Sequence, residues 1–264
     1  MSAAVAQPDT SLVVNRERMP FTIDAGIGLR ANLGLLVLRT DQTIEDEFRF
    51  ALPPDGIALY EARLYNDAEI TPEKLARMWD EIPATVSLLP AVTFAVVGFA
   101  CTSGALVIGE EKIAGRVREA LPGVAVTDPV TAARAALGAL DVSRIALLTP
   151  YIGAINHSLR NSLMARGMDI PVMGSFNEPD DNTVARISAE SIEQAILDIG
   201  ATAACDAVFV ACTSLRVARI VERVEQRLGK PVTSSNHALA WHMLRLGGVS
   251  DELSGKGALF RRPL

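Results

Sequence analysis

The sequence contains few cysteines and few aromatic residues. Its 264 residues include three cysteines, and aromatic residues make up 5% of the chain. The first 32 residues do not have the basic-then-apolar layout of a signal peptide. Together with the odd number of cysteines, this argues against a disulfide framework and for free thiols. We therefore expect a cytoplasmic protein with an N-terminal arm, residues 1–32.

Basic patches and long apolar runs are also lacking. The formal net charge is −6, and no basic stripe with interleaved aromatic residues is available to bind nucleic acid. Pro90, Gly98 and polar residues interrupt the longest apolar runs, so none reaches the roughly 18 residues of a membrane helix. With 49% hydrophobic and 21% charged residues, the chain can bury a large core. We expect neither nucleic acid nor a membrane as a partner. A homo-oligomer is possible on the sequence alone.

A Cys-Thr-Ser tripeptide occurs twice, at residues 101–103 and 212–214. Each copy follows an apolar run that is typical of a buried strand, so each strand delivers a thiol to its carboxyl end. The two tripeptides lie 111 residues apart, and other segments repeat at nearly the same interval. This self-similarity predicts two similar halves that face each other, with Cys101 and Cys212 opposed in one cleft.

Strand and helix patterns alternate along the rest of the chain. The expected strands are residues 33–38, 93–100, 124–126, 145–148, 206–211 and 231–233. Helices are expected to begin near residues 44 and 71 and to cover residues 110–120, 130–140, 156–166, 189–199, 214–228 and 237–246. The alternation predicts an α/β fold of two pseudo-symmetric Rossmann-like halves, each a parallel sheet flanked by helices. After the arm, the predicted first half is residues 33–127 with 234–264, and the second half is residues 128–233.

Cysteines at strand ends are candidates for catalysis. A free thiol has a pKa near 8.5, so its surroundings must lower that pKa before the sulfur acts as a base or nucleophile. After Cys212, a helix capped by Thr213 or Ser214 is expected to favour the thiolate. After Cys101, a Thr-Ser-Gly turn is expected, with the regular helix several residues later. The alternative is that both cysteines only pack in the core, which is our interpretation of Cys205.

Hydroxyl groups beside these cysteines predict a carboxylate site, because planar oxyanions are bound by several fixed donors. The candidate donors are Thr102, Ser103, Thr213 and Ser214. Tyr151 follows a predicted strand and is either an exposed loop residue or a substrate-facing hydroxyl. The three histidines lie on predicted helices, where a surface role is more common, and no CxxC or HExxH spacing accompanies them. No metal site is therefore expected.

Three motifs resemble those of the maleate cis-trans isomerase and arylmalonate decarboxylase branch of the Asp/Glu racemase superfamily. They are GFACTSG at residues 98–104, TPY at 149–151 and SNHALAW at 235–241. The similarity covers about residues 33–248. Within that branch, residues 36–47 and 241–247 look most like the ectoine-utilisation protein EutA. The resemblance implies a cofactor-independent enzyme with its active site between two Rossmann-like halves.

The resemblance also implies roles for the two cysteine positions. In the isomerases of the branch, the first cysteine attacks the alkene and the second handles the proton. The racemases use one cysteine as a base and the other as an acid, and the decarboxylases keep only the second, with glycine at the first position. Cysteine at both positions, Cys101 and Cys212, favours isomerase or racemase chemistry.

Two positions depart from these patterns. Maleate isomerases have asparagine where this chain has Asp41, and amino-acid racemases typically have asparagine where it has Thr102. A carboxylate at Asp41 would repel a dianionic substrate unless it were protonated or bound an amino group. The chain therefore differs from the maleate isomerases at Asp41 and from the amino-acid racemases at Thr102.

We therefore expect a cofactor-independent isomerase or racemase of a small amino- or hydroxy-carboxylate, in the breakdown of a compatible solute such as ectoine or hydroxyectoine. Cys101 and Cys212 are the predicted catalytic pair. The predicted substrate-binding residues are Asp41, Thr102, Ser103, Tyr151, Thr213 and Asn236. The alternatives are a maleate-type cis-trans isomerase that forms a covalent cysteine adduct, a malonate-type decarboxylase, and a non-catalytic two-lobed binding protein.

Overall fold

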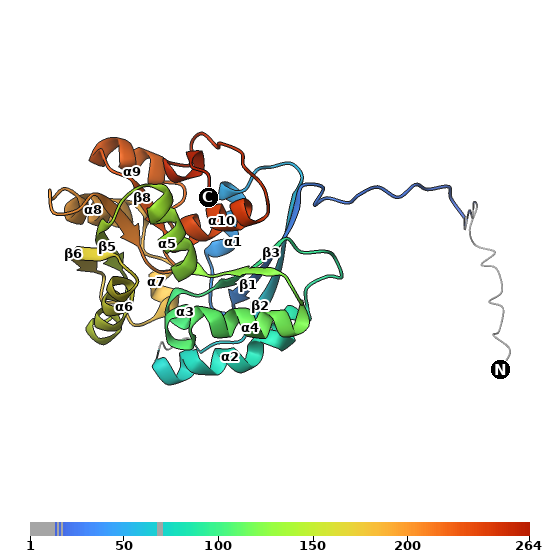
Figure 1. Cartoon of the computed structure of the whole chain (residues 1–264), viewed down its shortest axis with the longest axis horizontal. Coiled ribbons are helices and arrows are strands. Elements are labelled where there is room, and N and C mark those ends of the chain that lie inside the picture. Colours follow the sequence, from blue (N-terminus) through green and yellow to red (C-terminus); the bar gives the residue numbers. More distant parts are fainter. Residues whose placement is uncertain (1–13, 15, 17, 68–70) are drawn as a thin grey trace.

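The computed structural model describes residues 14, 16, 18–67 and 71–264. It contains two parallel sheets of four strands each (Figure 1). The first sheet consists of β1 (Ala31–Leu38), β2 (Ile57–Leu64), β3 (Val96–Ala100) and β4 (Ala125–Thr127). The second consists of β5 (Arg144–Thr149), β6 (Asp169–Ser175), β7 (Ala207–Val210) and β8 (Val232–Ser234). The strand orders, β2-β1-β3-β4 and β6-β5-β7-β8, are equivalent, which confirms the predicted α/β fold of two similar parallel halves.

Helices connect the parallel strands. Those of the first half of the chain are α1 (Ile44–Ala51), α2 (Pro72–Val86), α3 (Thr102–Ile108), α4 (Glu110–Ala120) and α5 (Pro129–Ala139). The remaining ones are α6 (Gly153–Ala165), α7 (Asp181–Val184), α8 (Ala189–Gly200), α9 (Val221–Leu228), α10 (Ser235–Leu246) and the short 3-10 helix η1 (Leu259–Arg261). No helix of the described residues is both long enough and apolar enough to cross a bilayer.

Local sequence signals explain where several helices begin. The hydroxyl of Thr71 accepts the backbone N–H of Lys74 at 3.4 Å, and Pro72 occupies the first position of α2, where its missing N–H costs nothing. Acidic residues fill the first turn of α1, where they oppose the positive end of the helix dipole. The predicted helix starts near residues 44 and 71 are confirmed.

Two strands were not predicted, and both are edge strands. β2 pairs only with β1, and β6 pairs only with β5. Their residues alternate irregularly between buried and exposed positions, whereas the central strands β3 and β7 are buried throughout. β2 and β6 lack the continuous apolar run that marks a buried strand of a parallel sheet, so the sequence pattern did not reveal either one.

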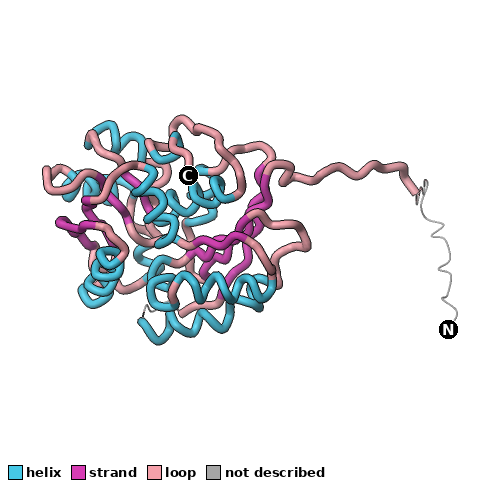
Figure 2. Tube along the Cα trace, in the orientation of Figure 1, coloured by secondary structure: helices cyan, strands magenta, loops and turns pink. Residues whose placement is uncertain are grey.

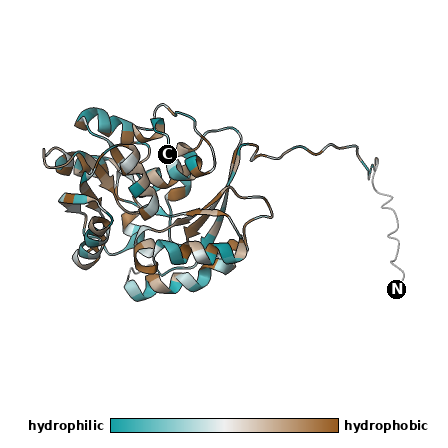
Figure 3. Cartoon of the chain, in the orientation of Figure 1, coloured by the Kyte–Doolittle hydropathy of each residue, from teal (hydrophilic) through white to brown (hydrophobic). Residues whose placement is uncertain are grey.

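The helix α10 lies in the interior. Its residues 235–244 are all buried, and it packs against α5, α1 and β3. Figure 3 shows the contrast between the apolar strands of the interior and the more hydrophilic outer helices. Because α10 follows β8 directly, its first residues lie at the carboxyl end of the second sheet, where the second cysteine also lies.

The segment before β1 runs away from the body of the protein. Residues 18–30 form no helix or strand, and they project as an extended loop in Figure 2. Residues 1–13, 15 and 17 of the predicted arm lie outside the described residues. The predicted boundaries of the two halves, residues 33–127 with 234–264 and residues 128–233, stay a prediction.

Candidate active site

The structure brings Cys101 and Cys212 to the same cavity. Cys101 directly follows β3 and Cys212 follows β7 by two residues, so both lie at the carboxyl ends of central strands, where parallel sheets bind ligands. The cavity between the two halves has a volume of about 20 Å³ and is lined by both cysteines, Thr102, Ser103, Tyr151, Thr213 and Ser214, among others. All three cysteines of the chain are free and buried.

Cys101 sits at the beginning of a helix. It is the N-cap of α3, and its Sγ accepts the backbone N–H of Gly104 at 3.2 Å. The hydroxyl of Ser103 lies 3.6 Å from the same sulfur. The prediction that the helix starts several residues later is wrong, because the thiol itself serves as the cap and α3 begins at Thr102. These contacts lower the pKa of Cys101, but burial outweighs them and raises it to about 11.

Cys212 sits in an irregular loop. Its φ is 153°, a backbone conformation that non-glycine residues rarely adopt. The Sγ accepts the backbone N–H of Ser214 at 3.4 Å and a hydrogen bond from the Tyr151 side chain. Burial, and then the negative charge of Asp181, raise the pKa of Cys212 well above its usual range. The predicted lowering of the thiol pKa values therefore does not hold for either cysteine in the ligand-free protein.

The predicted helix from residue 214 is also wrong in its first part. Only α9, Val221–Leu228, is helical. The Glu47 carboxylate of α1 accepts the backbone N–H groups of Val217 at 3.0 Å and Ala218 at 2.9 Å. These N–H groups are therefore not free to bond within a helix. A side chain from the first half thus determines the path of the second cysteine loop.

The predicted hydroxyl donors surround the thiols. The Oγ atoms of Thr102 and Ser235 lie 2.8 Å apart, and the Ser235 hydroxyl also accepts the backbone N–H of Cys212 at 3.1 Å. Ser235 therefore ties the two cysteine loops together. Tyr151 is 2% exposed, so it is a cavity residue and not an exposed loop tyrosine. Burial raises the pKa of Tyr151 well above its ordinary value, which keeps the hydroxyl protonated as a donor.

Asp41 and Asn236 are buried but do not line the cavity. The Oδ1 of Asp41 accepts the backbone N–H groups of Thr43 and Ile44 at 2.8 and 2.9 Å. Its Oδ2 has no hydrogen-bond partner, although the Thr213 side chain is close enough to lower the pKa of Asp41. Burial has the larger effect and raises that pKa.

Asn236 supports the second cysteine loop from behind. Its Nδ2 donates to the backbone carbonyl of Thr213 at 2.7 Å, while its Oδ1 has no hydrogen-bond partner. The Thr43 hydroxyl donates to the same carbonyl at 2.8 Å. The structure therefore places Asn236 against the loop that carries Cys212, and its role in substrate binding stays a prediction.

Five cavity residues were missed by the sequence analysis: Leu38, Asn66, Asp67, Leu75 and Asp181. Asp181 begins α7 and accepts the hydroxyls of Ser214 and Thr40, both at 2.7 Å. Asn66 donates to the Thr40 hydroxyl at 2.8 Å. Both residues line the cavity and follow the unpredicted edge strands β2 and β6. Assigning those strands would have pointed to these side chains, because ligands bind beyond the carboxyl ends of parallel strands.

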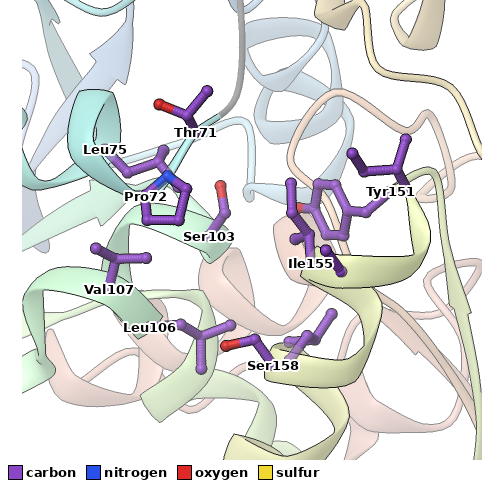
Figure 4. Close-up of a pocket in the computed structure, with 12 residues that line it drawn as sticks. Thr71, Pro72, Leu75, Ser103, Leu106, Val107, Tyr151, Ile155 and Ser158 are labelled. Atoms are coloured by element: carbon purple, nitrogen blue, oxygen red, sulfur yellow. The ribbon is translucent and has the colours of Figure 1, made fainter.

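An apolar pocket adjoins the cysteine cavity. It has a volume of about 250 Å³ and shares Leu75, Ser103 and Tyr151 with that cavity. Figure 4 shows Leu75 and Pro72 on one side, Tyr151 and Ile155 on the other, and Ser103 between them. The shared residues form a wall of side chains between the small polar cavity and the larger apolar pocket.

The histidines lie away from the thiols. His237 bonds Thr233 and the Lys256 carbonyl through its two ring nitrogens, at 3.0 and 2.7 Å. Burial lowers the pKa of His237 and of His242 to about 4. A surface role is therefore wrong for these two, and only His157 is exposed. Among the described residues no group of three His, Cys, Asp or Glu side chains is arranged to hold a metal ion.

Comparison with known proteins gives consistent matches. The model of the arylmalonate decarboxylase family matches residues 49–260. A maleate isomerase from Pseudomonas putida is 25% identical over 240 residues, covering 86% of this chain and 96% of that protein. An arylmalonate decarboxylase from Bordetella bronchiseptica is 29% identical over 224 residues, covering 79% and 91%.

A solved structure shows the same likeness. The maleate cis-trans isomerase of Nocardia farcinica, bound to TRIS, matches with a TM-score of 0.79 and 25% identity, covering 88% of this chain and 98% of that chain. The predicted resemblance to the maleate isomerase and arylmalonate decarboxylase branch is confirmed, while the closer likeness to EutA stays a prediction. The matched segment includes both cysteine loops and most of the two sheets, and the chain belongs to the arylmalonate decarboxylase family.

Proposed function

We propose that this protein is a cofactor-independent isomerase or racemase of a small carboxylate that bears an amino or hydroxyl group. The observation that carries the proposal is the pair of buried, free thiols, Cys101 and Cys212, which reach one cavity from two different sheets. Two thiols on opposite sides of one ligand suit proton transfer to and from the two faces of one carbon. The family's named relatives, isomerases and decarboxylases, support cysteine chemistry of this kind.

The substrate carboxylate has a set of donors near the thiols. Thr102, Ser103, Tyr151 and Thr213 contribute hydroxyl groups to the cavity wall. None of the described residues that line the cavity is an arginine, lysine or histidine, so the proposed carboxylate is held by neutral donors. Fixed hydroxyl and N–H groups stabilise the negative charge that develops on a carboxylate when the neighbouring carbon loses its proton.

Two carboxylates favour an amino group on the substrate. Asp41 and Asp181 are buried, and the negative charge of each raises the pKa values of both cysteines. Among the described residues neither carboxylate makes an ion pair within 4.0 Å. A buried charge without an opposite charge is costly, and a substrate ammonium group would supply that charge.

Nearby charged groups are engaged elsewhere. Asp67, the other carboxylate that lines the cavity besides Asp181 among the described residues, lies 3.3 Å from the ammonium of Lys74. The guanidinium of Arg63 binds the backbone carbonyl of Asp41 and the carboxylate of Glu45. Arg39 stacks over a tyrosine ring and donates to a backbone carbonyl. Asp181, which lines the cavity, and Asp41, which is buried behind its wall, are therefore the carboxylates that we assign to a cationic substrate.

An ammonium group would also activate the thiols. Burial raises the pKa of Cys101 to about 11 and that of Cys212 well above its usual range, so both thiols need an activating group. A positive charge bound beside Asp41 and Asp181 offsets the repulsion between these carboxylates and a thiolate, and so lowers the thiol pKa values. Catalysis then begins only when the proper substrate is bound.

The proposed step conserves protons. One cysteine, as the thiolate, removes the proton from the carbon next to the carboxylate, and the electron pair is delocalised onto the carboxylate held by the hydroxyl donors. The opposite thiol gives its proton to the other face of that carbon. One sulfur has gained a proton and the other has lost one, so the product is the inverted substrate and the two cysteines have exchanged roles.

Two other reactions belong to the same site. A maleate-type cis-trans isomerase would form a covalent bond between Cys101 and the alkene carbon, allow rotation and then eliminate the product. A malonate-type decarboxylase would need only Cys212 as the proton donor. Asp181 disfavours both, because maleate and malonates carry two negative charges and would be repelled by a carboxylate in the cavity wall.

The resemblance of residues 36–47 and 241–247 to ectoine-utilisation proteins supports a role in breakdown of a compatible solute. Ectoine and hydroxyectoine degradation would supply small acids that carry amino or hydroxyl groups. This part of the proposal rests on the sequence resemblance, and the site chemistry is compatible with it.

A panel of small carboxylates tests the proposal. Amino acids, their hydroxy analogues, maleate and arylmalonates are incubated with the protein in heavy water. Proton exchange predicts deuterium at the carbon beside the carboxylate together with inversion. A mass increase on the peptide containing Cys101 would indicate the cis-trans route, and release of carbon dioxide would indicate decarboxylation. If none of these signals is found, the binding-protein alternative replaces the enzyme.

A further inference from the structure

The arm that precedes β1 exposes many apolar side chains. Six of the thirteen exposed large hydrophobic residues among those described lie in it, at Val14, Met19, Phe21, Ile23, Ile27 and Leu29. Phe21 is 83% exposed and Ile23 is 88% exposed. Isolated exposed apolar residues are common, but a concentration of them on one segment marks an interaction site.

The apolar residues of the arm form a strip. Met19, Phe21 and Ile23 alternate with more polar positions, so in an extended chain their side chains lie on one face. Residues 18–30 have no regular secondary structure and project from the body (Figures 1 and 2). Arg30 anchors the base of the arm through an ion pair of 2.7 Å to Asp251. The strip beyond this anchor contacts no part of its own chain that would cover it, since its residues stay exposed.

The body of the same chain offers an apolar groove. One hollow is the pocket of about 250 Å³ between α2, α3 and α6, which Figure 4 shows. A second hollow of about 290 Å³ is lined by Trp79, Val107 and Ile108, among others. Val107 lines both hollows and is 41% exposed, and Trp79 is 37% exposed. The two hollows share Val107, and we refer to them together as the groove.

The arm lies outside the segment that the family model matches, residues 49–260. The two maleate isomerases from Pseudomonas putida and Nocardia farcinica are covered over 96% and 97% of their own length, while they cover only 86% and 89% of this chain. This chain therefore carries a segment that those relatives lack. The arm carries an exposed apolar strip, and the body of the chain carries an apolar groove. This combination suits an exchange of arms between two copies.

We propose that the arm of one copy docks in the groove of a second copy, with Phe21 and Ile23 on either side of Val107. Side chains two residues apart in an extended segment are separated by about 7 Å, which suits two adjacent hollows. Reciprocal docking of two arms gives a closed, symmetric dimer. Because the groove shares Leu75, Ser103 and Tyr151 with the cysteine cavity, the docked arm covers the wall of that cavity.

Sedimentation velocity of the full chain tests this dimer. The wild-type protein should sediment as a dimer over a wide concentration range. The double variant Phe21→Ser/Ile23→Ser and the groove variant Val107→Glu should both shift to the monomer. The matched control is Leu88→Ser, a residue 72% exposed outside the groove, and it should leave the dimer intact. Thermal unfolding and circular dichroism check that each variant is folded.

A cross-link distinguishes docking in the groove from other contacts of the arm. A mixture of two single variants, Phe21→Cys and Val107→Cys, should form a disulfide between different chains under mild oxidation, and a mixture of Phe21→Cys with Leu88→Cys should not. A monomeric wild-type protein, or a dimer that survives both the arm and the groove substitutions, would overturn the proposal. Dissociation by the arm substitutions without the cross-link would overturn the assignment of the groove.

Discussion

The two cysteine loops start from the same tripeptide but have different structures. After β3 the chain enters α3 at once, and Cys101 caps that helix with its own sulfur. After β7 the chain forms an irregular loop, in which Cys212 has a φ of 153° and receives hydrogen bonds from Ser214 and Tyr151. The two halves thus share a strand order, but the backbone and the hydrogen bonds around their two thiols differ.

The difference has a cause outside the tripeptide. In the second half, Glu47 binds the backbone N–H groups that would otherwise start a helix. The charge of Asp181 also acts more strongly on one thiol than on the other. After burial, it is the largest cause of the raised pKa of Cys212, whereas it is a minor cause for Cys101. Environments that separate the pKa values of two titratable groups assign them to different roles as acid and base. The comparison predicts that substitutions around the loops will affect the two thiols unequally.

The largest effect is expected from the thiols themselves. Cys101→Ser and Cys212→Ser should each slow inversion of the substrate by roughly 10³-fold or more, because a serine hydroxyl is a much weaker acid than a thiol. Chiral chromatography of the product measures this rate. Cys205→Ser is the control: this thiol lies in the core, with its sulfur 3.7 Å from the Gly200 carbonyl, so catalysis should persist. An inactive Cys205 variant beside an active Cys101 variant would contradict the assignment.

Asp181→Asn and Asp41→Asn should change both specificity and thiol reactivity. For an amino-acid substrate, kcat/KM should fall about 10- to 100-fold relative to its hydroxy analogue, the value of a hydrogen bond to a charged group. Alkylation by iodoacetamide should become about ten-fold faster, since removing a like charge favours the thiolate. For Asp181→Asn the gain should be larger at Cys212 than at Cys101.

Asp46→Asn is the matched control for these two variants. Its carboxylate lies on the exposed face of α1 and pairs with Arg219 at 2.9 Å, so its loss should leave the alkylation rates unchanged. Peptide mass spectrometry measures each cysteine separately. If Asp181→Asn accelerates the alkylation of both thiols equally, or of neither, the two cysteine loops do not differ in the way described. If the preference between amino and hydroxy acids is unchanged, the proposal that the substrate carries an ammonium group is wrong.

Glu47→Gln tests what holds the second loop. Burial raises the pKa of Glu47 from its ordinary 4.5 to about 7. The folded protein therefore binds a proton that the unfolded chain has released, and the free energy of unfolding falls as the pH rises from 4.5 to 7. This decrease, roughly 3 kcal/mol, should disappear in the variant. Urea unfolding at several pH values measures it, with exposed Glu119→Gln as the control. A parallel pH dependence in wild type and variant would contradict the role of Glu47.

The smallest effect is expected from Tyr151→Phe. The variant loses the hydrogen bond to Cys212 that lowers the pKa of this thiol, a contribution of about 1 kcal/mol. Activity should fall several-fold, and the rising limb of its pH profile should move to higher pH. Alkylation should slow at Cys212 and stay the same at Cys101. A change at Cys101 alone would show that Tyr151 serves the other loop.

Much of the fold and the thiol pair could be predicted because the signals are local and repeated. Buried central strands such as β3 and β7 read as apolar runs, and the same tripeptide follows each, so the topology of a parallel sheet brings the cysteines together. Helix starts such as the one at Thr71 depend on neighbouring residues. These features need no knowledge of distant contacts.

The rest depends on contacts between distant segments. Asp181 and Asn66 follow edge strands whose mixed polarity gave no strand signal, so their approach to the thiols was not seen. The start of α3 and the absence of a helix after Cys212 depend on which group binds the free N–H groups, a sulfur in one case and Glu47 in the other. The raised thiol pKa values follow from burial. A sequence pattern indicates which segments are buried, but not how completely a single side chain is buried.

The central claim is that Cys101 and Cys212 act on opposite faces of one carbon. It is tested most directly by deuterium exchange of separate enantiomers in heavy water, with the wild-type protein, Cys101→Ser and Cys212→Ser. The account predicts that the wild-type protein labels both enantiomers with inversion. Each variant should label one enantiomer without inversion, and the two variants should label opposite ones, because each remaining thiol reaches a single face. Variants that both label the same enantiomer, or inversion by the wild type without deuterium, would contradict the account.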